Sequence, residues 1–208
     1  MATATKEKKT ESKNDVVLLK PMNTQRLLVQ IEGTSPLIQH KWSEKALRQM
    51  REKQGGRKTK NREVRDPESE AVAATYFTNH GDYGLPVTAL KKSIIGAAHK
   101  DIGIEKTLVR KAIFIICDDK NDCLPMQCDE PIVREDTVRV GAGSADLRYR
   151  PEFRKWAIDF EIEIDADLLQ PSDVFNLIDR AGFGVGVGEW RPEKGGDNGR
   201  FRVKRKED

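Results

Sequence analysis

A glycine-rich segment near the end of the chain carries the clearest binding chemistry. Residues 181–203 read AGFGVGVGEWRPEKGGDNGRFRV. Glycine at this density permits positive φ angles and close approach of other backbones, and successive amide groups turned the same way form a cradle for anions. A central tryptophan and arginine add a stacking surface for bases and a guanidinium fork for phosphate. We predict that this segment binds a nucleic-acid backbone through Gly184, Gly186, Gly188, Trp190, Arg191, Lys194 and Arg200.

A dinucleotide-binding loop is the main alternative, because it is also rich in glycine. Such a loop follows a strand and precedes a helix, so that the phosphate meets the helix N-terminus. Here a predicted helix comes before the glycines and a predicted strand comes after them. This order excludes a dinucleotide loop. The sequence also contains no Walker loop, nucleophile elbow or zincin motif.

Three cysteines raise the question of a metal site. Cys117, Cys123 and Cys128 have the spacing C-x5-C-x4-C beside several aspartates. Zinc sites usually contain a close C-x2-C pair, because two thiolates from one tight turn share the tetrahedron. That pair is missing, and no histidine lies nearby in the sequence. We therefore expect no metal and no cofactor, and the odd cysteine number argues against a disulfide framework.

Charge is segregated along a chain whose net charge is only +3. Residues 41–65 hold ten Lys or Arg against three Glu, whereas residues 118–136 hold seven acidic residues against two basic ones. Segregation of this kind is common in proteins that meet phosphates on one surface; the alternative is a solvated loop of accidental sign. No apolar run approaches the ~18 residues of a membrane span, and no apolar leader is visible. We expect a cytoplasmic protein without membrane association.

Hydrophobic periodicity predicts the elements that position these residues. Residues 156–165 alternate strictly between apolar and polar or small side chains, which indicates a strand with one buried face. Further strands are predicted over 26–33, 110–117 and 200–204, with a hairpin joining 138–140 to 147–150. Helices are predicted over 42–54, 68–76, 86–99 and 171–182.

Without insertions, the element order is βαββαβ. This order predicts an α+β, ferredoxin-like (RRM-like) domain, in which two helices cover one face of an antiparallel sheet. The domain spans residues 21–208, after a disordered tail over 1–20, and has large insertions at 34–84 and 118–154. Asp159, Glu161 and Glu163 would face outward from the sheet and repel phosphate, unless Arg26 and Arg202 neutralise them. Binding is therefore expected at loops and helix ends.

Two segments resemble the RAMP superfamily, the repeat-associated mysterious proteins of CRISPR systems. Residues 182–203 are similar in place and character to the C-terminal glycine-rich loop of that superfamily. Residues 84–98 are similar to the hydrophobic-Pro-small-Ser-Ser-Leu-Lys-Gly start of the first helix in its backbone subunits. Pro86, Leu90 and Lys91 match this pattern, while Val87, Thr88, Ala89 and Lys92 depart from it.

The resemblance implies a fold, a ligand and partners. RAMP proteins have ferredoxin-like or RRM-like folds and bind RNA, and their backbone subunits polymerise along it. By this resemblance, the chain is a multi-copy or filament-forming subunit that binds single-stranded RNA or DNA, with its own copies or other effector subunits as partners. Lys91 and Lys92 would lie near the strand, the basic insertion would cover phosphates, and 118–154 would form a thumb. The additional contact residues are Arg57, Lys58, Lys60, Arg62, Arg148 and Arg150.

Some RAMP members cleave RNA with a histidine or a loop aspartate. The resemblance then implies His40 and Asp66 as catalytic candidates for a metal-independent or Asp-dependent endoribonuclease. We expect binding rather than catalysis. A phage or mobile-element protein of the same fold, which binds single-stranded DNA or acts against host defence, stays open as an alternative. A structural or virion protein is the third alternative.

Overall fold

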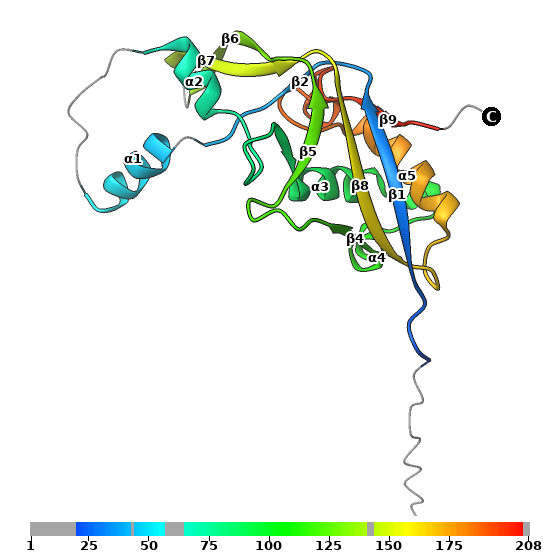
Figure 1. Cartoon of the computed structure of the whole chain (residues 1–208). Helices are drawn as coiled ribbons and strands as arrows, with labels where there is room; N and C mark the ends of the chain where they lie inside the picture. The colour runs from blue at the N-terminus through cyan, green and yellow to red at the C-terminus, as the bar shows by residue number, and fades with distance from the viewer. Residues whose placement is uncertain (1–19, 43, 57–64, 141–143, 206–208) are drawn as a thin grey trace, which may run out of the picture.

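The computed structural model describes residues 20–42, 44–56, 65–140 and 144–205. Its main sheet is antiparallel and is centred on β1 (Thr24–Gly33) and β8 (Trp156–Asp165), as Figure 1 shows. The two strands pair from Thr24 opposite Asp165 to Glu32 opposite Ala157. The short β9 (Phe201–Val203) pairs with the end of β1 and forms one edge of the sheet.

The second neighbour of β8 is a strand in two pieces. β4 (Ile113–Ile116) and β5 (Cys123–Cys128) both run antiparallel to β8. Between them the chain leaves the sheet, and β5 also pairs with β3 (Gly84–Pro86). When β4 and β5 are counted as one interrupted strand, the element order and the sheet order are those of a ferredoxin-like fold. The predicted α+β fold class is confirmed.

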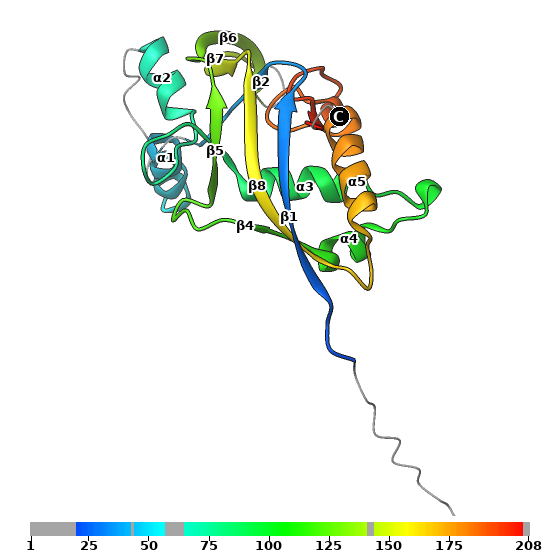
Figure 2. The same cartoon turned by 45° about the vertical axis from the view of Figure 1, so that its right-hand side comes forward.

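Two helices, α3 (Val87–Ala97) and α5 (Pro171–Gly184), cover one face of this sheet (Figure 2). The buried side chains of β8 are every second residue, from Trp156 to Ile164, as its period-two pattern predicts. They pack against Leu90 and Ile94 of α3 and the apolar stripe of α5. Strict alternation thus places Asp159, Glu161 and Glu163 on the opposite, open face.

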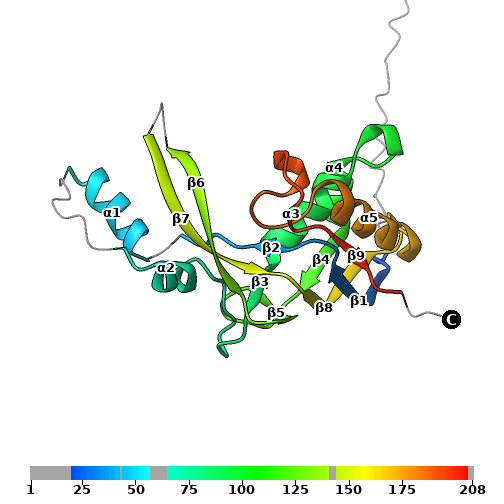
Figure 3. The ribbon, with the colours of Figure 1, turned by 90° about the horizontal axis from the view of Figure 1, so that it is seen from above.

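The two insertions meet in a second, three-stranded sheet. β6 (Ile132–Val140) and β7 (Ser144–Phe153) form the predicted hairpin, which is longer than expected. β2 (Leu37–Ile38), from the first insertion, pairs with the base of β7. Figure 3 shows the hairpin projecting away from the main sheet. The first insertion also contains α1 (Glu44–Gln54) and α2 (Pro67–Ala73), the latter lying against β7.

Several predicted boundaries are wrong. The strand predicted over 110–117 begins at Ile113, because residues 106–112 form α4 (Lys106–Ala112) and bury Val109 and Ala112 on one helical face. The segment 118–154 is only partly an excursion, since β5 belongs to the main sheet. The predicted disordered tail lies outside the described residues except for Lys20. No helix of the described chain is long and apolar enough to cross a membrane.

Candidate nucleic-acid interface

The glycine-rich segment packs tightly against residues 34–38. The amide of Glu189 donates to the carbonyl of Ile38 at 2.8 Å, and the amide of Gly199 donates to the carbonyl of Pro36 at 2.7 Å. Gly188 has a φ of +76°, and a Cβ there would collide with the Ile38 carbonyl. Glycine is therefore required at this position for close packing of two backbones.

The amides of this segment are largely satisfied within the protein. Gly186 donates to Ala181 at 2.8 Å, Val187 donates to Gly199 at 2.9 Å, and the amide of Asn198 donates to the carbonyl of Trp190 at 3.0 Å. Gly186 is buried, whereas Gly184 is exposed at the end of α5. The prediction of an anion cradle made of free amides is wrong for the amides that bond internally, because folded chains pair their buried backbone donors.

The two central side chains of the segment, Trp190 and Arg191, differ in how free they are to contact a ligand. The Nε and Nη2 atoms of Arg191 donate to one carboxylate oxygen of Glu193 at 3.1 and 2.7 Å, and Nη1 donates to the Gly188 carbonyl at 3.0 Å. This guanidinium is therefore neutralised locally. Trp190, by contrast, has a φ of +52° and is 42% exposed. Lys194 is also exposed, in the short helical turn η2 (Pro192–Lys194).

Three of the hairpin arginines, Arg134, Arg148 and Arg150, are held by carboxylates. Arg150 is buried, and its Nη1 lies 3.1 Å from Asp136, which also accepts a hydrogen bond from Arg134 at 2.8 Å. Burial by itself would raise the pKa of Asp136, but the hydrogen bonds and charges of Arg134 and Arg150 hold it below its usual value. Arg148 lies 3.1 Å from Asp146. The predicted phosphate contacts of Arg148 and Arg150 stay a prediction, and both would have to exchange a carboxylate for a phosphate.

Basic side chains without carboxylate partners lie along α3, the 3₁₀ turn η1 (Lys100–Ile102) and α4. This stretch has a clear excess of basic side chains, since its only acidic residues are Asp101 and Glu105. None of its Lys and Arg side chains forms an ion pair within the described part of the chain. They are Lys91, Lys92, Lys100, Lys106, Arg110 and Lys111.

These cations are held on ordered helices. Lys106 and Arg110 lie one helical turn apart on the exposed side of α4, and Lys92 is exposed on α3. Lys91 is half-buried, and its Nζ lies 4.3 Å from the centroid of the Phe114 ring. Sequence reasoning found Lys91 and Lys92 but missed the cations of α4, because it assigned residues 110–117 to a strand. The four-residue spacing of Lys106 and Arg110 was the signal for a helical face.

The helices and the glycine-rich segment lie on the same side of the sheet (Figure 3). α3 packs against α5, and Gly96 of α3 approaches Val185 so closely that a Cβ would lie 3.1 Å from its Cγ1. We call this side the helix-side surface. It is defined by the exposed residues Lys92, Lys100, Lys106, Arg110, Lys111, Trp190 and Lys194.

The open face of the sheet has a different charge pattern. Arg26 lies 3.2 Å from Glu163 and 3.7 Å from Glu161, as predicted. Arg202 pairs with Glu32 and not with the acids of β8. The Nε2 of Gln127 donates to Asp159 at 2.7 Å. Cations on this face are therefore matched by carboxylates, and the face offers little attraction to phosphate.

The two catalytic candidates occupy separate environments. His40 is half-buried after β2, and its pKa is lowered by burial and then by the charge of Arg150. Within the described chain, its Nδ1 is buried and has no hydrogen-bond partner. Asp66 precedes α2, where a hydrogen bond from the Ser69 hydroxyl lowers the pKa of its carboxyl. No described contact brings His40 and Asp66 together, and their catalytic role stays a prediction.

Two further predictions concern metal and the basic insertion. Burial raises the pKa of Cys123 and of Cys128 to about 11, so both thiols are protonated at neutral pH. Among the described residues, no group of three or more His, Cys, Asp or Glu is arranged to hold a metal ion. The predicted contacts of the basic insertion lie outside the described residues; they are Arg57, Lys58, Lys60 and Arg62.

Comparison with known proteins finds similarity at the level of structure. No family model matches the sequence, and no curated protein matches it. Among solved structures, the chain is similar to the crystal structure of Cmr6 from Pyrococcus furiosus, with a TM-score of 0.40 and 12% sequence identity. The match covers 88% of this chain and 100% of that chain. The likeness lies in the path of the backbone, and no residue role is transferred from it.

Proposed function

We propose that this chain binds single-stranded nucleic acid along its helix-side surface. By its resemblance to the RAMP superfamily, the expected strand is RNA, and the chain would act in several copies or beside other effector subunits. One observation carries the proposal: the Lys and Arg side chains of α3, η1 and α4 have no carboxylate partners in the described chain. Several arginines elsewhere do have them: Arg26, Arg134, Arg148, Arg150 and Arg191.

An unpaired cation has a direct energetic advantage at a phosphate. Binding releases the counterions condensed on the strand, and this release drives association without the loss of an existing ion pair. A paired arginine gains less, because its carboxylate must first be displaced and is then left unpaired. The helix-side cations are therefore the favoured phosphate contacts. Their separation over consecutive helices suits an extended strand.

The exposed Trp190 favours single-stranded over double-stranded nucleic acid as the ligand. An exposed indole stacks on a base of any identity, and stacking is worth about 1–3 kcal/mol per base. A base is free to stack in this way only when it is unpaired and unstacked from its neighbours. The positive φ of Trp190 and the internal bonds of the surrounding loop hold this ring at the surface. The combination favours binding with little sequence preference.

The proposal is tested by charge reversal on matched surfaces. A triple variant, K92E/K106E/R110E, removes helix-side cations; a control triple, K20E/K120E/K155E, removes equally exposed cations elsewhere and changes the net charge equally. Fluorescence anisotropy with labelled oligo-uridine and oligo-thymidine measures affinity against salt. We expect the helix-side triple to lose about 100-fold in affinity and to reduce the salt slope by about 2, at ~0.7 per single-strand contact. The control should stay within about twofold.

The same titrations separate the alternatives. Tighter binding of oligo-thymidine than of oligo-uridine would favour the phage or mobile-element alternative. Equal losses in the two triples would assign the affinity to net charge and contradict the helix-side surface. A structural or virion protein predicts no salt-dependent binding to either strand, because its contacts need not involve phosphate.

A further inference from the structure

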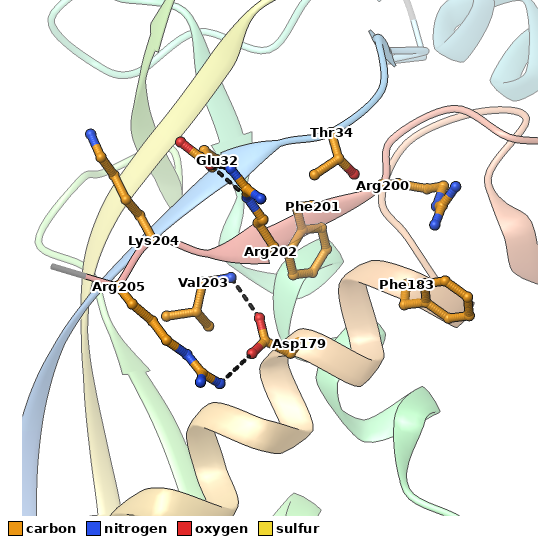
Figure 4. A pocket seen from close by; sticks show the side chains of 10 residues that line it. All are labelled: Glu32, Thr34, Asp179, Phe183, Arg200, Phe201, Arg202, Val203, Lys204 and Arg205. Atoms are coloured by element: carbon orange, nitrogen blue, oxygen red, sulfur yellow. Dashed lines mark hydrogen bonds and ion pairs between the residues drawn. The ribbon is translucent and has the colours of Figure 1, made fainter. Parts of the chain in front are cut away.

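A cavity of about 960 Å³ lies beside the edge strand β9 and the last turns of α5. The proposed strand-binding surface does not use it. Figure 4 shows its lining residues, with Phe183 and Arg200 at one end and Lys204 and Arg205 at the other. Its volume lies within the range of small-molecule sites, about 300–1,000 Å³.

The wall between α5 and β9 is fixed by close packing. A Cβ at Gly182 would collide with the carbonyl of Phe201, so glycine allows the helix to touch the strand. Asp179 of α5 accepts a hydrogen bond from the amide of Val203 at 2.7 Å and pairs with Arg205 at 3.1 Å. The cavity is therefore built on ordered elements and needs no rearrangement to exist.

An exposed aromatic ring stands at the rim of this cavity. Phe183 is 72% exposed. The guanidinium carbon of Arg200 lies 4.9 Å from the centroid of its ring. The ring thus keeps most of its surface open to a planar ligand, while the cation beside it is positioned for a negatively charged group of the same ligand.

The cations of the cavity differ in how they are paired. Arg202 is held by Glu32, and Arg205 is held by Asp179. Within the described contacts, Arg200 and Lys204 have no carboxylate partner, and the Nε of Arg200 is buried without a hydrogen-bond partner. Two unmatched cations and one open aromatic ring therefore line the same cavity.

We infer that this cavity binds one unstacked nucleotide, with its base on Phe183 and its phosphate at Arg200. Lys204, at the other end, is available to a further phosphate when the nucleotide belongs to a strand (Figure 4). The inference rests on the proposed function, because the nucleotide is taken to belong to the bound strand. A free nucleoside monophosphate has the same chemistry, and the test separates the two sources.

A fluorescent adenine analogue tests the inference. 2-Aminopurine loses fluorescence when it stacks on an aromatic ring, so we use it within an oligonucleotide and as the free monophosphate. With the parent protein we expect quenching of the oligonucleotide probe. F183A should abolish most of this quenching and weaken oligonucleotide affinity about tenfold, while F183W should retain both. Since Phe183 is exposed, these substitutions leave the core intact.

The arms of the experiment keep this inference distinct from the proposed function. Quenching of the free monophosphate that depends on Phe183 supports a site for free nucleotides, and quenching of the oligonucleotide alone supports a subsite for the strand. Equal quenching by the parent and F183A would overturn the inference, even if the helix-side charge reversal still abolished binding. Conversely, if oligonucleotides bind only through other surfaces, the monophosphate arm still tests the cavity directly.

Discussion

The β6–β7 hairpin and the α3–α4 stretch both carry many cations, but they use them in opposite ways. In the hairpin, Arg150 and Arg134 stand opposite each other across the two strands, and Asp136 bonds to both. In α4, Lys106 and Arg110 share an exposed face without a carboxylate partner in the described chain. The difference teaches that the number of cations in a region does not show how many of them lack a carboxylate partner.

The physical origin of this difference is the geometry of the two elements. Side chains directly opposite in an antiparallel pair lie close together, and like charges there are destabilising. The hairpin therefore needs Asp136 and Glu152, which bond to its arginines. A short surface helix separates like charges by a full turn at a smaller cost. Its cations remain exposed to solvent and to ligands.

The largest effect, on the free energy of unfolding, should come from breaking the ion-pair network of the hairpin. R150M removes a buried cation and leaves Asp136 with one partner instead of two. Loss of one member of a buried ion pair costs about 3 kcal/mol or more, and urea unfolding measures this loss. The exposed R154M is the control, with an expected change below about 1 kcal/mol. A stable R150M protein with much weaker strand binding would contradict a structural role for Arg150.

A smaller effect, on strand affinity, should come from freeing Arg191 of its carboxylate partner. E193Q removes the carboxylate that neutralises this guanidinium beside Trp190. We expect strand affinity to rise about threefold and the salt slope to steepen, because one more cation can displace counterions. The matched control is E163Q, which removes the closer of the two carboxylates that pair with Arg26 on the open face of the sheet. Equal gains from both variants would show that the two faces do not differ.

The smallest expected stability effect concerns His40. Its pKa is lowered below 6.5 by burial and by Arg150, so the unfolded chain binds a proton more readily than the folded one. The resulting stability is present above pH 6.5 and is lost as the pH falls through the lower folded pKa. Melting temperatures between pH 8 and pH 5 should therefore decline less in H40N than in the parent. An identical decline in both proteins would contradict this assignment.

No effect is expected on the integrity of the bound strand. His40 has a buried Nδ1, and Asp66 is engaged at the start of α2, so no described pair of acid and base converges. Labelled RNA incubated with the parent protein in the presence of a chelator should remain uncut, and H40A should behave identically. Cleavage by the parent that H40A abolishes would assign catalysis to His40.

Much of the fold was predictable because its signals are local. The alternation of residues 156–165 identified β8 and its buried face, and Pro171 with the apolar stripe after it identified α5. The α4 helix was missed because apolar residues follow it without a break. They made a strand pattern that was taken to begin at Arg110, inside the helix. The interrupted strand formed by β4 and β5 was also missed, because its two pieces are joined only by their common partner β8.

The site was less predictable because its contacts are long-range. The glycines were interpreted as a cradle of free amides, yet the partners of those amides include Pro36 and Ile38, far away in the sequence. Likewise, nothing in the sequence around Arg148 or Arg150 reveals which carboxylates hold them. Lys91 and Lys92 were found because the resemblance pointed to the start of that helix. Phe183 gave no sequence signal beyond its place among glycines.

Crosslinking of a bound strand gives the most direct test of the helix-side surface. Oligo-uridine containing 4-thiouridine would be irradiated with the full-length protein, and crosslinked peptides would be identified by mass spectrometry. We predict crosslinks in residues 87–112 and 184–199, with Trp190 among the modified side chains. Crosslinks confined to the open face of β1 and β8, or to the β6–β7 hairpin, would contradict the proposal.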